Sequence, residues 1–190
     1  MLKFAFDRII ALTLLPLVVV ISILCMIIIR IESEGNPLFI QKRIGKNLKQ
    51  FKLIKLRTMK ANSVNAGSHL VSENQITAIG RLLRRTKLDE IPQIWNVLLG
   101  HMSFVGPRPC LPSQKDVINC REKFGVNRLR PGITGPSQLA GIDMSTPSEL
   151  ARSDAIYLTE NGLLSDILMM LKTVGGKGRG DAIFSSSKEK

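Results

Sequence analysis

The chain is poor in the side chains that bind metals or form disulfide bonds. Its 190 residues include three cysteines and two histidines, and no two cysteines form a CxxC pair. His69 and His101 have no metal-ligand spacing to each other or to a cysteine. This scarcity argues against a zinc site and against a disulfide framework.

Aromatic and acidic residues are also scarce. Aromatic residues make up 5% of the sequence, and 27 lysines and arginines face 15 acidic residues, which gives a net charge of +12. Such a charge attracts phosphate-bearing partners, whether nucleotides, nucleic acids or anionic lipids. GGKGRG near the C-terminus favours a nucleic-acid-binding protein as one alternative. Because no stripe of interleaved basic and aromatic residues accompanies it, we expect no nucleic acid as a partner.

What the sequence has instead is a long apolar run. Residues 9–29 carry no charge, and as one helix they extend roughly 31 Å, about the thickness of the hydrocarbon core of a bilayer. The run lacks a signal-peptide cleavage site, and Leu24 precedes Cys25 where a lipoprotein signal needs a small residue. We therefore expect a retained segment that lies in membrane lipid.

A proline within the run indicates how it enters the membrane. Pro16 lacks the N–H group of a helix hydrogen bond, so a helix bends there. Lys3 and Arg8 precede the run and Arg30 follows it, so the positive-inside rule gives no orientation for a simple span. These features predict a helix that enters one leaflet and returns, with both ends in the cytoplasm. An ordinary spanning anchor with a tolerated proline is the alternative.

After the membrane segment, the residue pattern predicts a hairpin, a loop and a basic helix. Two short strands are expected around a turn at residues 45–47, where Gly and Asn tolerate left-handed backbone. The polar stretch 60–76 is expected to be a loop. Residues 77–86 predict a short helix with arginines on one face.

Start and stop signals predict three more helices, over residues 89–99, 147–157 and 163–174. Asp89 is the expected N-cap of the first, and Thr146 and Glu149 form a capping-box pattern before the second. Loops rich in Gly and Pro are expected at 106–109 and 130–136, and a disordered tail at 185–190.

Several motifs together resemble those of the bacterial sugar transferases, the small monotopic phosphoglycosyl transferases that begin glycoconjugate assembly on undecaprenyl phosphate. The resemblance starts at Phe6 and Asp7 and covers nearly the whole chain in the family's order. The matching segments are IQKRIGKN, KLIKLRTM, LDEIPQIWNVLLGHMSFVGPRP and RPGITG.

The resemblance implies a mainly helical α/β fold on the cytoplasmic face of a bacterial inner membrane. Residues 1–32 would form a re-entrant membrane helix. Residues 33–184 would form the phosphoglycosyl transferase domain, with a short β-hairpin and amphipathic helices at the interface. Larger relatives carry additional N-terminal membrane helices, so we expect the minimal form of the family here.

The catalytic pair of the family, an adjacent Asp and Glu, falls on Asp89 and Glu90. Taken alone, acidic residues at a helix start are explained by capping and by the helix dipole. The resemblance instead implies that Asp89 attacks the sugar-bearing phosphate of a UDP-sugar, that UMP leaves, and that undecaprenyl phosphate then takes the phosphosugar. It also implies Mg²⁺ near Asp89, with Glu90 positioning the metal or handling a proton. An N-acetylated hexosamine is the expected sugar.

The resemblance also implies substrate-binding residues. Some would bind phosphate, and others belong to a loop that the family associates with the uridine end of the donor. They are Lys55, Arg57, Arg84, Pro107, Arg108, Pro109 and Gln138. Taken alone, each basic residue is explained as a solvated charge, and GPRP as a tight turn. Downstream glycosyltransferases and a second copy of the chain are further candidate partners.

The chain departs from the family pattern at a few positions. Leu15 stands where serine is common before the proline, and His101 stands where aspartate is usual. Pro136 and Ser137 replace a Trp-Ala pair. We expect these changes to affect loop geometry and sugar preference. A non-catalytic membrane-anchored scaffold is the second alternative, and the intact acidic pair argues against it.

Overall fold

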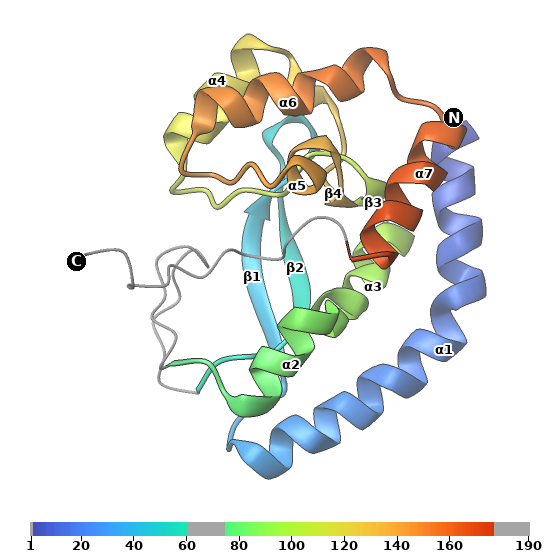
Figure 1. Ribbon diagram of the computed structural model, residues 1–190, viewed down its shortest axis with the longest axis vertical. Helices are drawn as coiled ribbons and strands as arrows, with labels where there is room; N and C mark the ends of the chain where they lie inside the picture. Colours follow the sequence, from blue (N-terminus) through green and yellow to red (C-terminus); the bar gives the residue numbers. More distant parts are fainter. Residues whose placement is uncertain (1, 61–74, 177–190) are drawn as a thin grey trace.

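The computed structural model describes residues 2–60 and 75–176, which form a long N-terminal helix and a mainly helical domain that packs against it (Figure 1). The helices are α1 (Leu2–Glu32), α2 (Ala78–Thr86), α3 (Ile94–Leu98), α4 (Lys115–Lys123), α5 (Pro136–Ala140), α6 (Pro147–Thr159) and α7 (Leu163–Val174). The 3₁₀ helices are η1 (Lys46–Leu48), η4 (Leu88–Gln93) and η5 (Val126–Arg128). The strands are β1 (Leu38–Ile44), β2 (Gln50–Leu56), β3 (Ser103–Val105) and β4 (Gly132–Thr134). The expected mainly helical α/β fold is confirmed.

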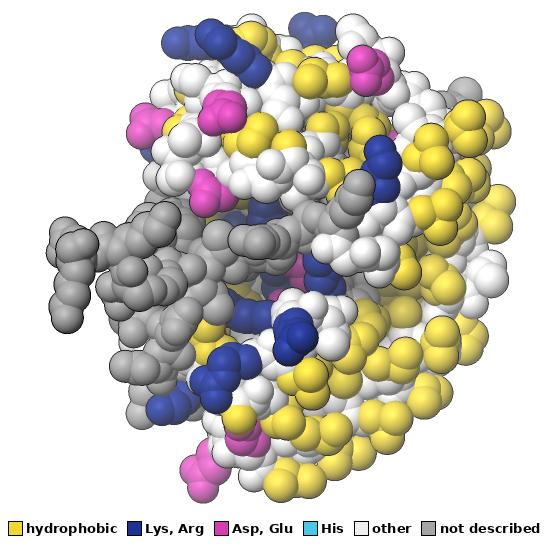
Figure 2. Space-filling model, viewed as in Figure 1, with side chains coloured by type: hydrophobic (Ala, Val, Ile, Leu, Met, Phe, Trp, Pro, Cys, Tyr) yellow, Lys and Arg dark blue, Asp and Glu magenta, His cyan; other side chains and the backbone are white. Residues whose placement is uncertain are grey.

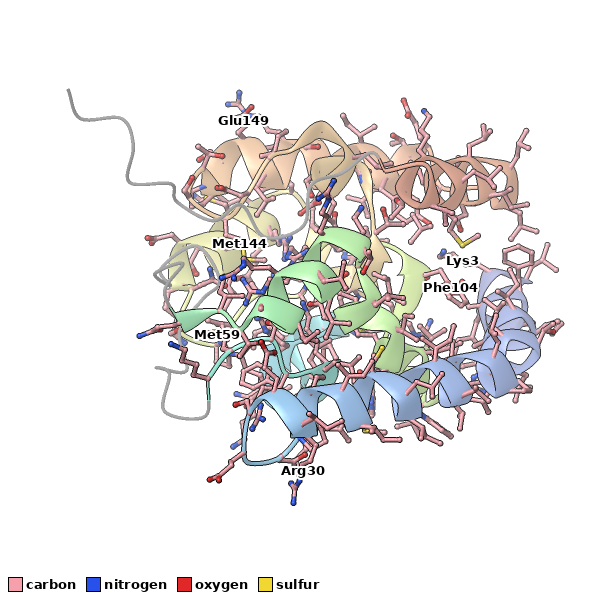
Figure 3. All side chains as sticks on the ribbon, turned by 60° about the horizontal axis from the view of Figure 1, so that its bottom comes forward. Lys3, Arg30, Met59, Phe104, Met144 and Glu149 are labelled. Atoms are coloured by element: carbon pink, nitrogen blue, oxygen red, sulfur yellow. The ribbon has the colours of Figure 1, made fainter. Side chains whose placement is uncertain are left out.

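Helix α1 continues through Pro16 and bends along its length (Figure 1). Its composition and length suffice to cross a membrane, and most of its apolar window is exposed. The other described elements lie on the inner side of the bend in both ribbon views (Figures 1 and 3). The outer side exposes a row of large apolar side chains, which is the continuous hydrophobic surface along α1 in Figure 2. They include Ile9, Leu12, Leu17, Val20, Leu24, Ile27 and Ile31.

Both ends of α1 are tied to the same domain. Near the N-terminus, the Lys3 ammonium lies 2.5 Å from the Asp166 carboxylate of α7. At the other end, the Glu32 carboxylate accepts a hydrogen bond of 2.7 Å from the Ala78 N–H of α2. Figure 3 labels Lys3 and Arg30 at these opposite ends. Both ends of α1 therefore contact the same domain.

The predicted hairpin is confirmed. Strands β1 and β2 are antiparallel, and their register runs from Leu38 opposite Leu56 to Ile44 opposite Gln50. The turn differs in detail from the prediction. Gly45 has extended backbone, and the left-handed residue of the predicted stretch is Asn47.

A second, two-stranded sheet was not predicted. Strands β3 and β4 pair in parallel, with Ser103 opposite Gly132. The pairing brings the two Gly/Pro-rich loops together, because a Cβ atom on Gly132 would lie only 2.1 Å from the backbone nitrogen of Gly106. Each loop therefore fixes the position of the other.

Within the part of the chain that the structure describes, three apolar clusters hold the elements together. The first joins α1 to β2 and α3 through Ala11, Phe51, Leu53, Ile94, Val97 and Met102. The second joins the end of α1 to β2 and α2 through Cys25, Ile29, Leu56 and Leu83. The third joins α4 to α6 through Cys110, Val117, Ile118 and Leu150. Since α1 contributes to two of these clusters, its inner side is part of the domain's core.

The remaining helix predictions are largely confirmed. Helix α2 begins after Thr77, whose side chain accepts a hydrogen bond from the Gly80 N–H, and α7 spans the expected residues. Helix α6 begins at Pro147 as expected, but Thr146 makes no side-chain cap bond, so the predicted capping box is wrong. Most of the predicted loop at 60–76, and the predicted tail at 185–190, lie outside the described residues.

Candidate active site

The acidic pair lies in the 3₁₀ helix η4. Lys87 has left-handed backbone, with φ of 59°, and separates α2 from η4, while α3 begins only at Ile94. The prediction that Asp89 is an α-helix N-cap is therefore wrong, because the turn at Lys87 places the pair in a tighter helix that contains Pro92. The Asp89 residue is 8% exposed.

Asn96 of α3 connects the segment of the acidic pair to the hairpin by hydrogen bonds. Its side-chain oxygen accepts a hydrogen bond of 3.1 Å from the Ile54 N–H, and its side-chain nitrogen donates one of 2.7 Å to the Lys52 carbonyl. Asn96 is buried, so these bonds also satisfy an amide that would otherwise be costly to remove from water. Helices η4 and α3 thus take their position from β2.

Two cations from separate elements converge on Glu90. The Lys55 ammonium of β2 lies 2.8 Å from Glu90 Oε1, and an Arg108 guanidinium nitrogen lies 3.6 Å from the same oxygen. All three side chains are mostly buried, so solvent screens their attraction less than at an open surface. The predicted site residues Lys55, Glu90 and Arg108 are therefore neighbours.

The GPRP loop is held by its backbone carbonyls. The carbonyl of Pro107 accepts a hydrogen bond of 2.9 Å from the Gly132 N–H. The carbonyls of Arg108 and Pro109 accept bonds of 2.8 and 3.0 Å from the guanidinium groups of Arg121 and Arg43, respectively. This loop therefore presents the Arg108 side chain from a fixed backbone.

A buried ion pair lies beneath the loop. Arg121 of α4 donates two hydrogen bonds, of 2.9 and 2.6 Å, to Asp154 of α6. The second Asp154 oxygen accepts a bond of 2.6 Å from the Ser137 hydroxyl. The pair therefore supports both the Arg108 backbone and the residue before Gln138. Sequence analysis missed it, because an arginine and an acidic residue 33 positions apart carry no pairing signal.

Gln138 has an unused side-chain donor. Its side-chain oxygen accepts a bond of 3.2 Å from Ser137, while its side-chain nitrogen is buried without a hydrogen-bond partner among the described residues. Gln138 lines the same cavity as Glu90 and Arg108. An acceptor group on a ligand would satisfy this amide.

Arg57 and Arg84 have other partners. An Arg57 guanidinium nitrogen donates a bond of 2.6 Å to the Ser33 carbonyl after α1, and Arg84 Nε donates one of 2.9 Å to the Thr58 hydroxyl. Neither arginine lines the recesses around Glu90. The phosphate-binding role of these two arginines stays a prediction.

Two recesses meet at Glu90 and Arg108. The first is small and polar, and its lining includes Lys55 and Arg43. The second is a cavity of about 360 Å³ whose walls are apolar side chains of α1, α3, β4 and α7, with Lys87 and Gln138 beside Glu90. Figure 2 shows basic and acidic side chains at the bottom of a hollow on this face, beside the hydrophobic surface over α1. The site thus combines a charged recess with an apolar one.

Lys87 is a site residue that sequence analysis missed. Burial lowers the pKa of its ammonium group, Arg108 lowers it further, and Glu90 opposes the shift. Its left-handed backbone gives no sequence signal, because lysine is not a residue that favours this conformation.

The donor set suits a magnesium ion only in part. Within residues 2–60 and 75–176, no group of three or more His, Cys, Asp and Glu side chains could hold a metal. Asp89 and Glu90 supply carboxylates from consecutive residues, and Mg²⁺ is often held by one or two carboxylates while substrate phosphates supply other ligands. The pair therefore fits a metal that arrives with a phosphate substrate.

Most positions that depart from the family pattern have structural roles. Pro136 is the first residue of α5, and Ser137 is the buried partner of Asp154. Leu15 packs against the first apolar cluster, and the His101 ring lies 5.8 Å from the ring of Phe51. None of them lines either recess at Glu90.

Comparison with known proteins finds one family and several relatives. The family model described as bacterial sugar transferase matches residues 1–177. UDP-N-acetylgalactosamine-undecaprenyl-phosphate N-acetylgalactosaminephosphotransferase of Aeromonas hydrophila is 31% identical over 91% of this chain, which spans 43% of that protein. UDP-glucose:undecaprenyl-phosphate glucose-1-phosphate transferase of Caulobacter vibrioides is 34% identical over 90% of this chain and 68% of its own length. Exopolysaccharide production protein PSS of Rhizobium leguminosarum bv. phaseoli is 36% identical over 91% of this chain and 93% of its own length.

Proposed function

The chain belongs to the bacterial sugar transferase family, and from this premise we propose that it transfers a phosphosugar from a UDP-sugar to undecaprenyl phosphate and releases UMP. The observation that carries the proposal is the meeting of the two recesses at Glu90 and Arg108. A nucleotide diphosphate needs a charged pocket, and a lipid phosphate needs an apolar one beside it. Both kinds of pocket share Glu90, the neighbour of Asp89 in the sequence.

The membrane arrangement supports a reaction at the lipid surface. Both ends of α1 contact one domain, while its outer side exposes apolar residues, as a helix embedded in one leaflet requires. Lys3, Arg8 and Arg30 flank the apolar run, and the positive-inside rule assigns such flanks to the cytoplasm. We therefore propose the cytoplasmic face of the bacterial inner membrane as the location.

The proposed chemistry has two exchanges at one phosphorus atom. An Asp89 carboxylate oxygen attacks the sugar-bearing phosphorus, and the bond from that phosphorus to the bridging oxygen breaks, so UMP leaves with this oxygen. A phosphate oxygen of the lipid then attacks the same phosphorus, and the bond to Asp89 breaks. Each step exchanges one phosphate linkage for another, so neither an oxidant nor a reductant is needed.

The two acidic residues have different surroundings, which supports different roles. The Lys55 and Arg108 cations already hold Glu90 and reduce its power as a nucleophile. The same cations lie where the donor's charge would arrive, and Gln138 offers a free amide donor beside them. Pro107 and Pro109 hold the loop of Arg108, which we propose contacts the uridine end of the donor.

Mg²⁺ is part of the proposal as a partner of the donor diphosphate, with Asp89 as its protein ligand. When bound, it would neutralise charge on the transferring phosphoryl group. Chelation of divalent cations should therefore stop UMP release. The sugar stays open between the classes named for the relatives, and we propose an N-acetylated hexosamine, as in the name of the Aeromonas relative.

The test measures UMP release by the purified protein with Mg²⁺, undecaprenyl phosphate and a panel of UDP-sugars. Asp89→Asn should abolish release, whereas Asp116→Asn, an exposed aspartate of α4, should retain it. Incubation with a sugar-labelled donor and no lipid should give a phosphosugar adduct on the peptide that contains Asp89, found by mass spectrometry. An adduct on Glu90, or a folded Asp89→Asn variant with full activity, would overturn the assignment. Absence of release with every donor would favour the scaffold alternative.

A further inference from the structure

The larger cavity at the site has the shape of an amphiphile's binding pocket. Its polar end carries Lys87, Glu90 and Arg108, and its apolar walls include Val18 of α1 and Met170 of α7. A volume of about 360 Å³ lies at the small end of ligand pockets, which span roughly 300–1,000 Å³. It therefore holds only the part of a long lipid that is next to its head group.

The cavity opens toward the lipid-facing side of the protein. Leu14 of α1 and Val174 of α7 line the cavity, and they are also 40% and 87% exposed. The Thr134 and Thr173 hydroxyls lie 2.6 Å apart and hold α7 to β4 at the cavity wall. A hydrocarbon chain can therefore leave the cavity between α1 and α7 and continue along the exposed apolar side of α1.

Lys87 has a backbone conformation that is usually occupied by residues other than lysine. The residue after α2 has left-handed backbone, and its N–H bonds to the carbonyls of Leu83 and Arg84. Glycine or asparagine is the usual residue in this kind of helix end, because a side chain with a Cβ atom is strained there. A lysine at this point suggests that its side chain serves the site rather than the helix.

We propose that this cavity binds the isoprene units next to the phosphate of a single-chain polyprenyl phosphate, and that the Lys87 ammonium binds that phosphate. The inference rests on the proposed function and deepens it, because it assigns the acceptor to the cavity and leaves the recess of Lys55 to the donor. The cationic end and the apolar walls complement the two parts of this lipid. Glu90 and Arg108 line both pockets, so the two phosphates meet beside Glu90.

The experiment separates acceptor binding from donor chemistry. The donor half-reaction is measured as exchange of labelled UMP into the UDP-sugar without lipid, and the full reaction gives KM for undecaprenyl phosphate. Lys87→Gly should raise the acceptor KM roughly tenfold to a hundredfold, the range for losing a hydrogen bond to a charged group, and should lower the half-reaction by a much smaller factor than full transfer. Lys87→Arg should restore most of the affinity. Leu14→Trp, which fills the cavity, should also raise the acceptor KM.

Matched controls come from the same chain. Asn47→Gly makes the same kind of change at another left-handed residue, and Leu17→Trp adds a tryptophan to an exposed position of α1 that does not line the cavity. Both should keep the wild-type acceptor KM. Lys87→Gly should melt at the wild-type temperature or above, since glycine relieves the backbone.

Three results would overturn the inference. They are an unchanged acceptor KM in Lys87→Gly and Leu14→Trp, a half-reaction that falls as much as full transfer, and equal competition by a two-chain phospholipid. Direct binding of undecaprenyl phosphate, measured by native mass spectrometry without donor, tests the cavity independently of catalysis. If the wild type binds this lipid, and Leu14→Trp binds it less, while no UDP-sugar releases UMP, the proposed reaction fails and the lipid site stands.

Discussion

The buried pair of Arg121 and Asp154 provides a prediction whose size follows from its geometry. Arg121→Met removes the guanidinium group. Among the described residues, the fully buried Asp154 carboxylate then keeps the hydrogen bond from the Ser137 hydroxyl and loses its positive partner. Removing one partner of a buried ion pair costs about 3–5 kcal/mol, because the remaining charge is uncompensated. The Arg108 carbonyl also loses its donor.

This loss converts into a large change of melting temperature. For a chain of 150–250 residues, 1 kcal/mol shifts the melting temperature by about 2–4 °C, so Arg121→Met should lower it by about 6–20 °C. The double variant Arg121→Met/Asp154→Leu removes both charges. It should be destabilised by less than the sum of the two single variants, because well-packed apolar replacements of a buried pair are often close to neutral.

Thermal unfolding in detergent, followed by far-ultraviolet circular dichroism, measures these shifts. Arg152→Met is the matched control, since Arg152 is exposed on α6, and it should melt within about 2 °C of the wild type. A shift of less than about 2 °C in Arg121→Met would refute the reasoning that the pair is desolvated and interdependent. Additive losses in the double variant would refute the coupling.

Three further predictions concern topology, close packing and alkaline stability. In a variant without native cysteines, Leu2→Cys and Asn36→Cys should both react with a membrane-impermeant thiol reagent from the cytoplasmic side; reaction of the two from opposite sides would establish a true span. Gly132→Ala should lower stability by about 1–3 kcal/mol or more in thermal unfolding, because the new Cβ would lie 2.1 Å from the Gly106 nitrogen, whereas Gly162→Ala meets only ordinary contacts. A wild-type melting temperature in Gly132→Ala would contradict the close approach of the two loops. Burial and the neighbouring Asp166 raise the pKa of Tyr157 above its ordinary value of 10.0, so the folded protein should lose stability as pH rises above about 10, where the unfolded tyrosine ionises first. Tyr157→Phe should weaken that loss in melting curves taken across this range, and an unchanged pH slope would contradict it.

Local patterns in the sequence predicted the elements whose causes are local. The charge-free run and the hairpin turn act on residues only a few positions away, so they can be read in order along the chain. The family motifs added the acidic pair and the positions around it. The prediction that Asp89 is an N-cap was wrong because Asp before an apolar stretch is typical of a helix start. The left-handed turn at Lys87 instead places Asp89 inside a 3₁₀ helix.

Only the tertiary structure decided which side chains meet. Lys55, Glu90 and Arg108 come from a strand, a 3₁₀ helix and a loop, and their contacts depend on how the hairpin packs against η4 and β3. The parallel pairing of β3 with β4 and the ion pair of Arg121 with Asp154 join segments far apart in the sequence. Ion pairs and close backbone contacts depend on distance in space, whereas caps, turns and periodicity depend on distance along the chain. For this reason the sequence alone identified the acidic pair, and the fold was needed to join Glu90 to a charged recess and an apolar cavity.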